Sequence, residues 1–121
     1  MSEHLADFDS PEMLNALEEL EKGNHAEAFA LLVPLANAGN PRAQCNLATL
    51  YHLGRGVQKD GRKAIELYRR VAEQGIREAC LSGVAYNNLA TIYFTGLPGI
   101  EPNPEKAREY LAHARELGFE M

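Results

Sequence analysis

The chain lacks long apolar runs, a cysteine-rich pattern and an export signal. No apolar run approaches the roughly 20 residues that a membrane-spanning helix needs. Two cysteines, Cys45 and Cys80, are too few for a disulfide framework, and neither has a Cys or His at metal-ligand spacing. The start, MSEHLADFDS, has neither the basic region nor the apolar core of a signal peptide. We therefore expect a cytoplasmic protein with reduced thiols, no membrane segment, no metal and no cofactor.

Charge is unevenly distributed along the 121 residues, whose net charge is −5. Residues 1–30 and 78–121 are acidic, whereas residues 40–77 are basic. A net acidic chain is a poor ligand for nucleic acid, and no aromatic run is interleaved with the bases, so we expect no nucleic-acid partner. The basic stretch is either a solvated face balanced by its acidic neighbours or, around Arg62 to Arg70, a second candidate binding face. The length suits one domain.

An internal repeat is the strongest pattern in the sequence. A first set of positions returns 42 residues later: Ala43, Leu47, Ala48, Tyr51 and Gly54 become Ala85, Leu89, Ala90, Tyr93 and Gly96. A second set returns 43 residues later: Gly56, Val57, Asp60, Lys63 and Ala64 become Gly99, Ile100, Asn103, Lys106 and Ala107. A weaker match at 36 residues links Ala28, Leu35, Ala36 and Gly39 to Ala64, Val71, Ala72 and Gly75.

Each repeat unit predicts two helices, because its apolar residues follow the i, i+3, i+4, i+7 spacing. Predicted N-caps are Ser10, Asn40, Asp60 and Asn103, with a capping box at Asn24 and Glu27. Predicted helix ends are Gly23, Gly54, Gly75 and Gly118, the last two followed by the apolar Ile76 and Phe119. These signals predict an arm over residues 1–9 and one domain over 10–121, with antiparallel helix pairs at about 11–39, 41–75 and 77–118.

The third pair carries an insertion, within IREACLSGVAYNN, relative to the second. Gly83 interrupts a run that otherwise suits a helix. The inserted residues around Cys80 to Tyr86 therefore form either an extra turn leading into the fifth helix or a bent connection.

The string A-x-x-x-L-A-x-x-Y-x-x-G-x-G-V-x-x-D-x-x-K-A-x-x-x-Y-x-x-V-A-x-x-G, within residues 41–75, resembles the Sel-one-like repeat, a relative of the tetratricopeptide repeat. Residues 85–118 resemble it with departures: Leu111 replaces an aromatic, Arg115 replaces alanine, and Gly-Leu-Pro-Gly replaces Gly-x-Gly. The resemblance covers almost all of the chain after residue 10. It implies an all-α fold, a short right-handed α/α superhelix of three helix pairs.

Gly54-Arg55-Gly56 is either a phosphate-binding loop or a turn that requires glycine. A phosphate loop places its backbone amides at the start of a helix and carries a Gly-Lys-Ser/Thr signature. Here a helix precedes the glycines, four residues separate Gly56 from the next helix, and that signature is absent. The sequence favours backbone roles: one glycine ends a helix with positive φ, the other reverses the chain, and Val57 packs between the two helices.

The resemblance also implies a concave surface formed by the first helix of each pair, where an extended peptide or a helix binds. On this basis the expected partner-binding residues are Arg42, Cys45, Asn46, Thr49, His52, Asn87, Asn88, Thr91 and Phe94. Asn46 and Asn88 either bond the backbone of a bound peptide or serve the fold alone. Phe94 is either an anchor in the groove or packs on the inserted segment. Arg42 and His52 either complement an acidic partner or are ordinary surface.

These features predict a non-enzymatic module that binds a partner protein. A narrower alternative, also implied by the resemblance, is a bacterial cytosolic immunity protein that neutralises a toxin. A third hypothesis is an enzyme or small-ligand protein built on Cys45 and His52, although no nucleophile and base occur in a recognisable order. Glu109 and His113 supply two metal ligands without a third.

The apolar C-terminal residues Leu117, Phe119 and Met121 suggest either a homodimer through that end or docking of the tail onto the last helix.

Overall fold

The computed structural model describes residues 10–74 and 81–117, which form six α-helices. They are α2 (Pro11–Lys22), α3 (His25–Asn37), α4 (Pro41–Leu53), α5 (Gly61–Glu73), α6 (Leu81–Thr95) and α7 (Pro104–Glu116). No β-strand occurs in these two ranges, where the one extended pairing is an isolated bridge between Leu97 and Ile100. The predicted all-α fold is confirmed, and the predicted pairs correspond to α2–α3, α4–α5 and α6–α7.

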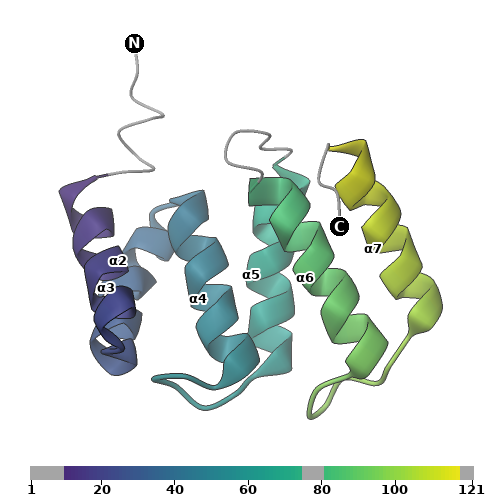
Figure 1. Cartoon of the computed structure of the whole chain (residues 1–121), viewed down its shortest axis with the longest axis horizontal. Helices are drawn as coiled ribbons and strands as arrows, with labels where there is room; N and C mark the ends of the chain where they lie inside the picture. Colours follow the sequence, from purple (N-terminus) through teal and green to yellow (C-terminus); the bar gives the residue numbers. More distant parts are fainter. Residues whose placement is uncertain (1–9, 75–80, 118–121) are drawn as a thin grey trace.

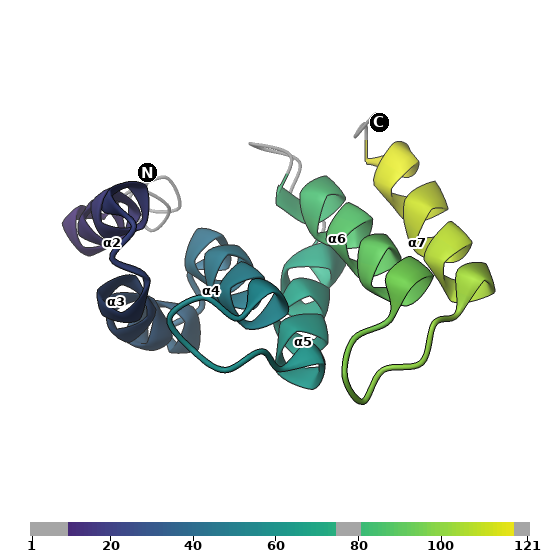
Figure 2. The ribbon, with the colours of Figure 1, turned by 60° about the horizontal axis from the view of Figure 1, so that its bottom comes forward.

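The helices form a short curved array. Each helix packs against the next one along the chain, and α4 also contacts α6. The α2–α3, α4–α5 and α6–α7 connections lie along one side of the array and the α3–α4 connection lies along the opposite side, so the two helices of each pair run antiparallel (Figure 1). In Figure 2 the first helices of the pairs, α2, α4 and α6, lie on the inner side of the curve. This arrangement is an α/α solenoid of three stacked pairs.

Four predicted N-caps are confirmed by side-chain hydrogen bonds. The oxygen of each side chain accepts the backbone N–H three residues further on, at 3.0–3.1 Å; the caps are Ser10, Asn40, Asp60 and Asn103. Each bond satisfies one of the N–H groups that the first turn of a helix leaves without a partner. The starts of α2, α4, α5 and α7 therefore agree with the predicted caps.

The predicted capping box at Asn24 is wrong. The backbone N–H of Asn24 donates to the carbonyl of Glu19 at 2.9 Å, as part of the turn that ends α2 at Gly23. The Asn24 side chain turns the same way, and its Nδ2 donates to Glu19 Oε1 at 2.8 Å. A capping box needs that N–H for the side chain of Glu27, so the tight turn excludes it.

Two of the predicted glycine endings lie in the described residues. Gly23 ends α2 with a φ of 83°, and Gly54 ends α4 with a φ of 70°, both in the left-handed region. The predicted endings at Gly75–Ile76 and Gly118–Phe119 lie outside the described residues, as do the arm over residues 1–9 and Cys80. The division into one arm and one domain stays a prediction.

Within the described residues, the insertion lengthens α6 instead of bending it at Gly83. Ala85 is the fifth residue of α6, whereas its equivalent Ala43 is the third residue of α4. Gly83 is helical and buried, and so is Ser82. The Ser82 hydroxyl donates to the backbone carbonyl of Val71 in the last turn of α5 at 2.6 Å. The added residues therefore fasten the start of α6 to the end of α5.

The repeated positions form the core. Ala43, Leu47 and Ala48 of α4 are buried, and so are their equivalents Ala85, Leu89 and Ala90 of α6. The repeated tyrosine and lysine also meet: Lys63 Nζ lies 5.9 Å from the centre of the Tyr51 ring, and Lys106 Nζ lies 5.1 Å from that of Tyr93. Each of these cation–π contacts joins the two helices of one pair, which explains why the residues recur at a fixed spacing.

Candidate functional site

The nine residues predicted to bind a partner lie on two of the three inner helices. Arg42, Cys45, Asn46, Thr49 and His52 belong to α4, and Asn87, Asn88, Thr91 and Phe94 belong to α6. Eight of them are at least partly exposed, and Cys45 is buried. Spacings of three, four and seven residues on α4 and α6 place most of these residues along one side of each helix.

Cys45 is a structural thiol. Burial raises the pKa of Cys45 to about 11, although the nearby Arg42 charge acts in the opposite direction. The thiolate is the nucleophilic form of cysteine, and at neutral pH this thiol stays protonated. The pKa therefore argues against the hypothesis of an enzyme that uses Cys45 as its nucleophile.

Thr49 and His52 contact Tyr68 of α5. The Thr49 hydroxyl and the Tyr68 hydroxyl lie 2.9 Å apart, and His52 Nδ1 lies 3.5 Å from the same tyrosine oxygen. The His52 and Tyr68 rings meet edge to face, at 6.1 Å between centroids and 86° between planes. Desolvation raises the pKa of Tyr68, so its hydroxyl stays protonated. Thr49 and His52 thus hold α4 against α5, in addition to any role at the surface.

His52 is expected to make the stability of the fold depend on pH. Burial, and then the charge of Lys59, lower the pKa of His52 from 6.5, so the unfolded chain binds a proton there before the folded chain does. The stabilising contribution is complete above the unfolded pKa of about 6.5 and is lost as the pH falls from there through the lower folded pKa. The urea midpoint of a His52→Gln variant should fall less between about pH 7 and pH 5 than that of the native chain. Equal slopes for the two proteins would contradict this account, because every other histidine is common to both.

The polar side chains predicted to bind a partner differ in whether they already make a hydrogen bond within their own helix. The Thr91 hydroxyl donates to the carbonyl of Asn87 at 3.1 Å, one turn earlier in the helix. Asn46 Nδ2 makes the same kind of bond, to the carbonyl of Arg42 at 2.9 Å. The side chain of Asn88 is partly exposed and makes no hydrogen bond to any residue in 10–74 or 81–117. Asn88 therefore presents an amide that a partner backbone can meet with both a donor and an acceptor.

Three large apolar side chains are exposed in the described residues, and each belongs to a different inner helix. Leu14 of α2 is 53% exposed, Leu53 of α4 is 46% exposed and Phe94 of α6 is 44% exposed. Sequence reasoning found Phe94 and missed both leucines. The sequence contains a signal that could have shown Leu14 to be exposed, since Leu14 lies on one helical stripe with the acidic Glu18 and Glu21. Leu53 has none, because it is the last residue before the glycine that ends α4.

A hollow of about 610 Å³ lies between α2 and α4. One residue of α4, Asn46, contributes to its lining, and α2 supplies the rest: Leu14, Leu17, Glu18, Leu20 and Glu21. Its lining thus combines three leucines with two exposed carboxylates. This hollow connects Asn46, which the sequence singled out, to a helix that supplied none of the predicted binding residues.

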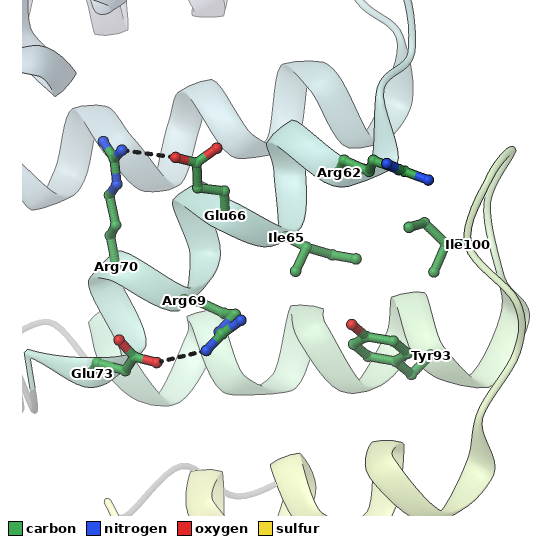
Figure 3. Close-up of a pocket in the computed structure, with 8 residues that line it drawn as sticks. All are labelled: Arg62, Ile65, Glu66, Arg69, Arg70, Glu73, Tyr93 and Ile100. Atoms are coloured by element: carbon green, nitrogen blue, oxygen red, sulfur yellow. Dashed lines mark hydrogen bonds and ion pairs between the residues drawn. The ribbon is translucent and has the colours of Figure 1, made fainter.

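A second hollow, of about 420 Å³, lies between α5, α6 and the α6–α7 loop (Figure 3). We call it the α5 groove; its lining residues are Arg62, Ile65, Glu66, Arg69, Arg70 and Glu73 of α5, Tyr93 of α6 and Ile100 of the loop. The basic stretch from Arg62 to Arg70, noted as a second candidate face, thus borders a concave surface on the second helix of a pair.

Comparison with protein families decides the family. The model of the Sel1 repeat matches residues 41–76 and 83–119, which include α4, α5, α7 and all but the first two residues of α6. The chain belongs to the Sel1 repeat family. Sel1 repeats generally mediate protein–protein interactions and are typically non-enzymatic scaffolds, so the broad class predicted for this chain is supported.

Two relatives extend this result. A solved Sel1 repeat protein from Oxalobacter formigenes superposes with a TM-score of 0.73 and 28% identity, over 92% of this chain and 41% of that one. A curated protein of Schizosaccharomyces pombe, named chitin synthase regulatory factor 3, is 30% identical over 88 residues, which are 73% of this chain and 9% of the fungal protein. This chain thus spans less than half of either relative.

The Sel1 repeats show no metal centre in the part of the chain that the structure describes, where no three His, Cys, Asp or Glu side chains gather. His113 stacks on Tyr86 at 5.1 Å, and its Nδ1 lies 3.4 Å from Glu116 Oε1. None of the helices in residues 10–74 and 81–117 combines the length and the apolar character that crossing a bilayer requires.

Proposed function

We propose that this Sel1 repeat chain is a non-enzymatic interaction module that holds a peptide or a helix of a partner protein on its inner surface, formed by α2, α4 and α6. The observation that carries the proposal is the distribution of the exposed apolar side chains Leu14, Leu53 and Phe94, one on each inner helix. Exposed apolar groups with polar neighbours are typical of surfaces that bind proteins. Asn46 and Asn88, at equivalent positions of the two repeats, bond the backbone of the bound segment.

A double substitution, Asn46→Ala with Asn88→Ala, should weaken binding of the partner by roughly tenfold and leave the fold intact. Neither asparagine side chain makes a hydrogen bond to another helix within the described residues, and alanine favours helix formation. The partner is first captured from a lysate of the source organism on the native chain and identified by mass spectrometry. Its affinity for the native and variant chains is then measured by calorimetry.

Asn37→Ala is the matched control, because Asn37 is an exposed asparagine at the end of α3, outside the inner helices. It should bind as tightly as the native chain. Equal affinity of the double variant and this control would remove Asn46 and Asn88 from the binding surface. Loss of binding in both the double variant and the Asn37→Ala control would point to a general loss of folding instead.

Neutralisation of a toxin by a bacterial cytosolic immunity protein is a narrower form of the same binding function. It stays a prediction, and a toxin-encoding gene beside this one would support it. A homodimer through the C-terminal end also stays a prediction, because residues 118–121 lie outside the described residues.

A further inference from the structure

The α5 groove has walls that packing holds in place. The Tyr93 ring lies nearly parallel to the Tyr110 ring, at 5.8 Å and 23°, with Lys106 Nζ 5.1 Å from its centre. Ile100 belongs to a tight turn in which it exchanges two backbone hydrogen bonds with Leu97, at 3.1 and 2.7 Å. That turn lies directly on the start of α5, where a Cβ added to Gly61 would lie 2.9 Å from Ile100 Cγ1. The apolar part of the groove is therefore formed before any ligand binds.

The arginines of the groove differ in how firmly they are paired. Arg70 binds Glu66 at 2.8 Å, with the acid one turn before the base, the favoured order on a helix. Arg69 binds Glu73 at 3.4 Å in the reverse order, and in both pairs the two side chains are more than half exposed. Arg62 is exposed and makes no ion pair or hydrogen bond with any described residue. Arg62 and Arg69 are thus the two cations that a ligand can recruit at low cost.

The spacing of these two arginines defines the ligand. They are seven residues apart on one helix, which separates them by about 10 Å along its axis. Ile65 lies between them and projects into the groove with Tyr93 and Ile100 (Figure 3). A volume of about 420 Å³ is large enough for an aromatic side chain. The groove therefore matches an apolar side chain that has a carboxylate on either side.

We propose that the α5 groove binds an acidic segment of a partner protein, whose aromatic or large apolar side chain enters between Ile65, Tyr93 and Ile100 while flanking carboxylates pair with Arg62 and Arg69. The site goes beyond the proposed function, because it lies on the second helix of a pair and uses none of the inner-surface residues. A nucleic-acid backbone fits less well. Glu66 and Glu73 line the same groove and repel a continuous row of phosphates, and the chain carries a net charge of −5.

The test uses synthetic peptides and amide chemical shifts of the ¹⁵N-labelled full chain. The first probe is a blocked peptide with a central phenylalanine and a glutamate on each side, the two glutamates three residues apart. The comparison probes replace both glutamates by glutamine, both by lysine, or the phenylalanine by alanine. We expect the first probe to shift amides of α5, of α6 near Tyr93 and of the loop at Ile100, with an affinity about threefold to tenfold above that of the glutamine peptide.

Two variants assign the charge effect. Arg62→Gln should reduce the affinity for the glutamate peptide part of the way to that of the glutamine peptide, because the pair with Arg69 remains. Arg55→Gln, which removes the same charge from an exposed loop outside the groove, should leave it unchanged. Arg69→Gln repeats the test at the second cation, and the amide spectrum of each variant reports directly whether it is folded.

Several results would overturn the proposal. One is the absence of amide shifts in the groove at about 5 mM glutamate peptide, because any binding would then be too weak to matter. Others are equal binding of the lysine peptide, and binding of free 3-phenylpropionate without binding of the peptide, which would assign the groove to a small carboxylate. Shifts confined to α2, α4 and α6 would also reject this site while leaving the inner-surface proposal standing.

Discussion

Gly56→Ala is expected to lower the free energy of unfolding by about 2–5 kcal/mol. Gly56 has a φ of 73°, in the left-handed region that costs an alanine about 1–2 kcal/mol. A Cβ there would also lie 2.5 Å from both the carbonyl carbon and the oxygen of His25, so the backbone of the loop or of α3 must move. Overpacking of that kind adds about 1–3 kcal/mol.

Gly99→Ala separates the two contributions to this loss. Gly99 occupies the equivalent place in the other repeat, with a φ of 82°, and has no atom within 4 Å of an added Cβ. It should lose only the conformational part, about 1–2 kcal/mol. Urea unfolding followed by circular dichroism measures both variants against the native chain. If the two substitutions cost the same, the close approach of the loop to His25 contributes nothing.

The Gly56 contact also decides between the two interpretations of Gly54-Arg55-Gly56. Gly54 ends α4 in the left-handed conformation, and Gly56 lets the α4–α5 loop pass against the start of α3. Val57 is partly buried and packs against the core, and its predicted place between the two helices stays a prediction. These positions join the second helix pair to the first, and the glycines are explained by backbone geometry without a phosphate.

The sequence predicted best what depends on local interactions repeated at a fixed spacing. Asn40, Asp60 and Asn103 cap their helices because a side-chain oxygen meets an N–H only three residues away. Leu47 and Leu89 are buried because each repeat places its leucine at the same point of the same stack. Both kinds of prediction need no knowledge of distant contacts.

Asn24 shows where local reasoning failed. The pattern Asn24-x-x-Glu27 satisfies the capping rule, but the same Asn24 N–H is the last donor of the turn that closes α2. Both local motifs need the Asn24 N–H group, and in the structure it donates to the turn that ends α2. The spacing of the residues could not reveal this competition, because both motifs match the sequence.

The α5 groove could not be predicted, because its parts come from two repeats. Ile65 belongs to the second pair, whereas Tyr93 and Ile100 belong to the third. The departure of Gly96–Gly99 from the repeat pattern was visible in the sequence. Its consequence, a turn that presses Ile100 onto α5, depends on how the pairs stack.

Leu89→Ala should lower the free energy of unfolding by about 2–5 kcal/mol, because Leu89 is fully buried and its truncation leaves a cavity. Leu53→Ala removes the same atoms from a side chain that is 46% exposed, and should cost about 0.5 kcal/mol or less. Urea titration of the two variants checks the difference. Similar losses would mean that the core around α6 closes over the missing side chain.

The helices in which Leu89→Ala reduces protection from hydrogen exchange test whether the array is stabilised pair by pair. In a stack of helix pairs each unit is stabilised mainly by its neighbours, so a defect in α6 should loosen the units that touch it first. Helix α6 packs on α5 and α7, and neither α2 nor α3 is among its main contacts. Hydrogen exchange of Leu89→Ala should therefore rise most in α6 and α7 and least in α2 and α3. An equal rise in every helix would show that the three pairs unfold as one cooperative unit.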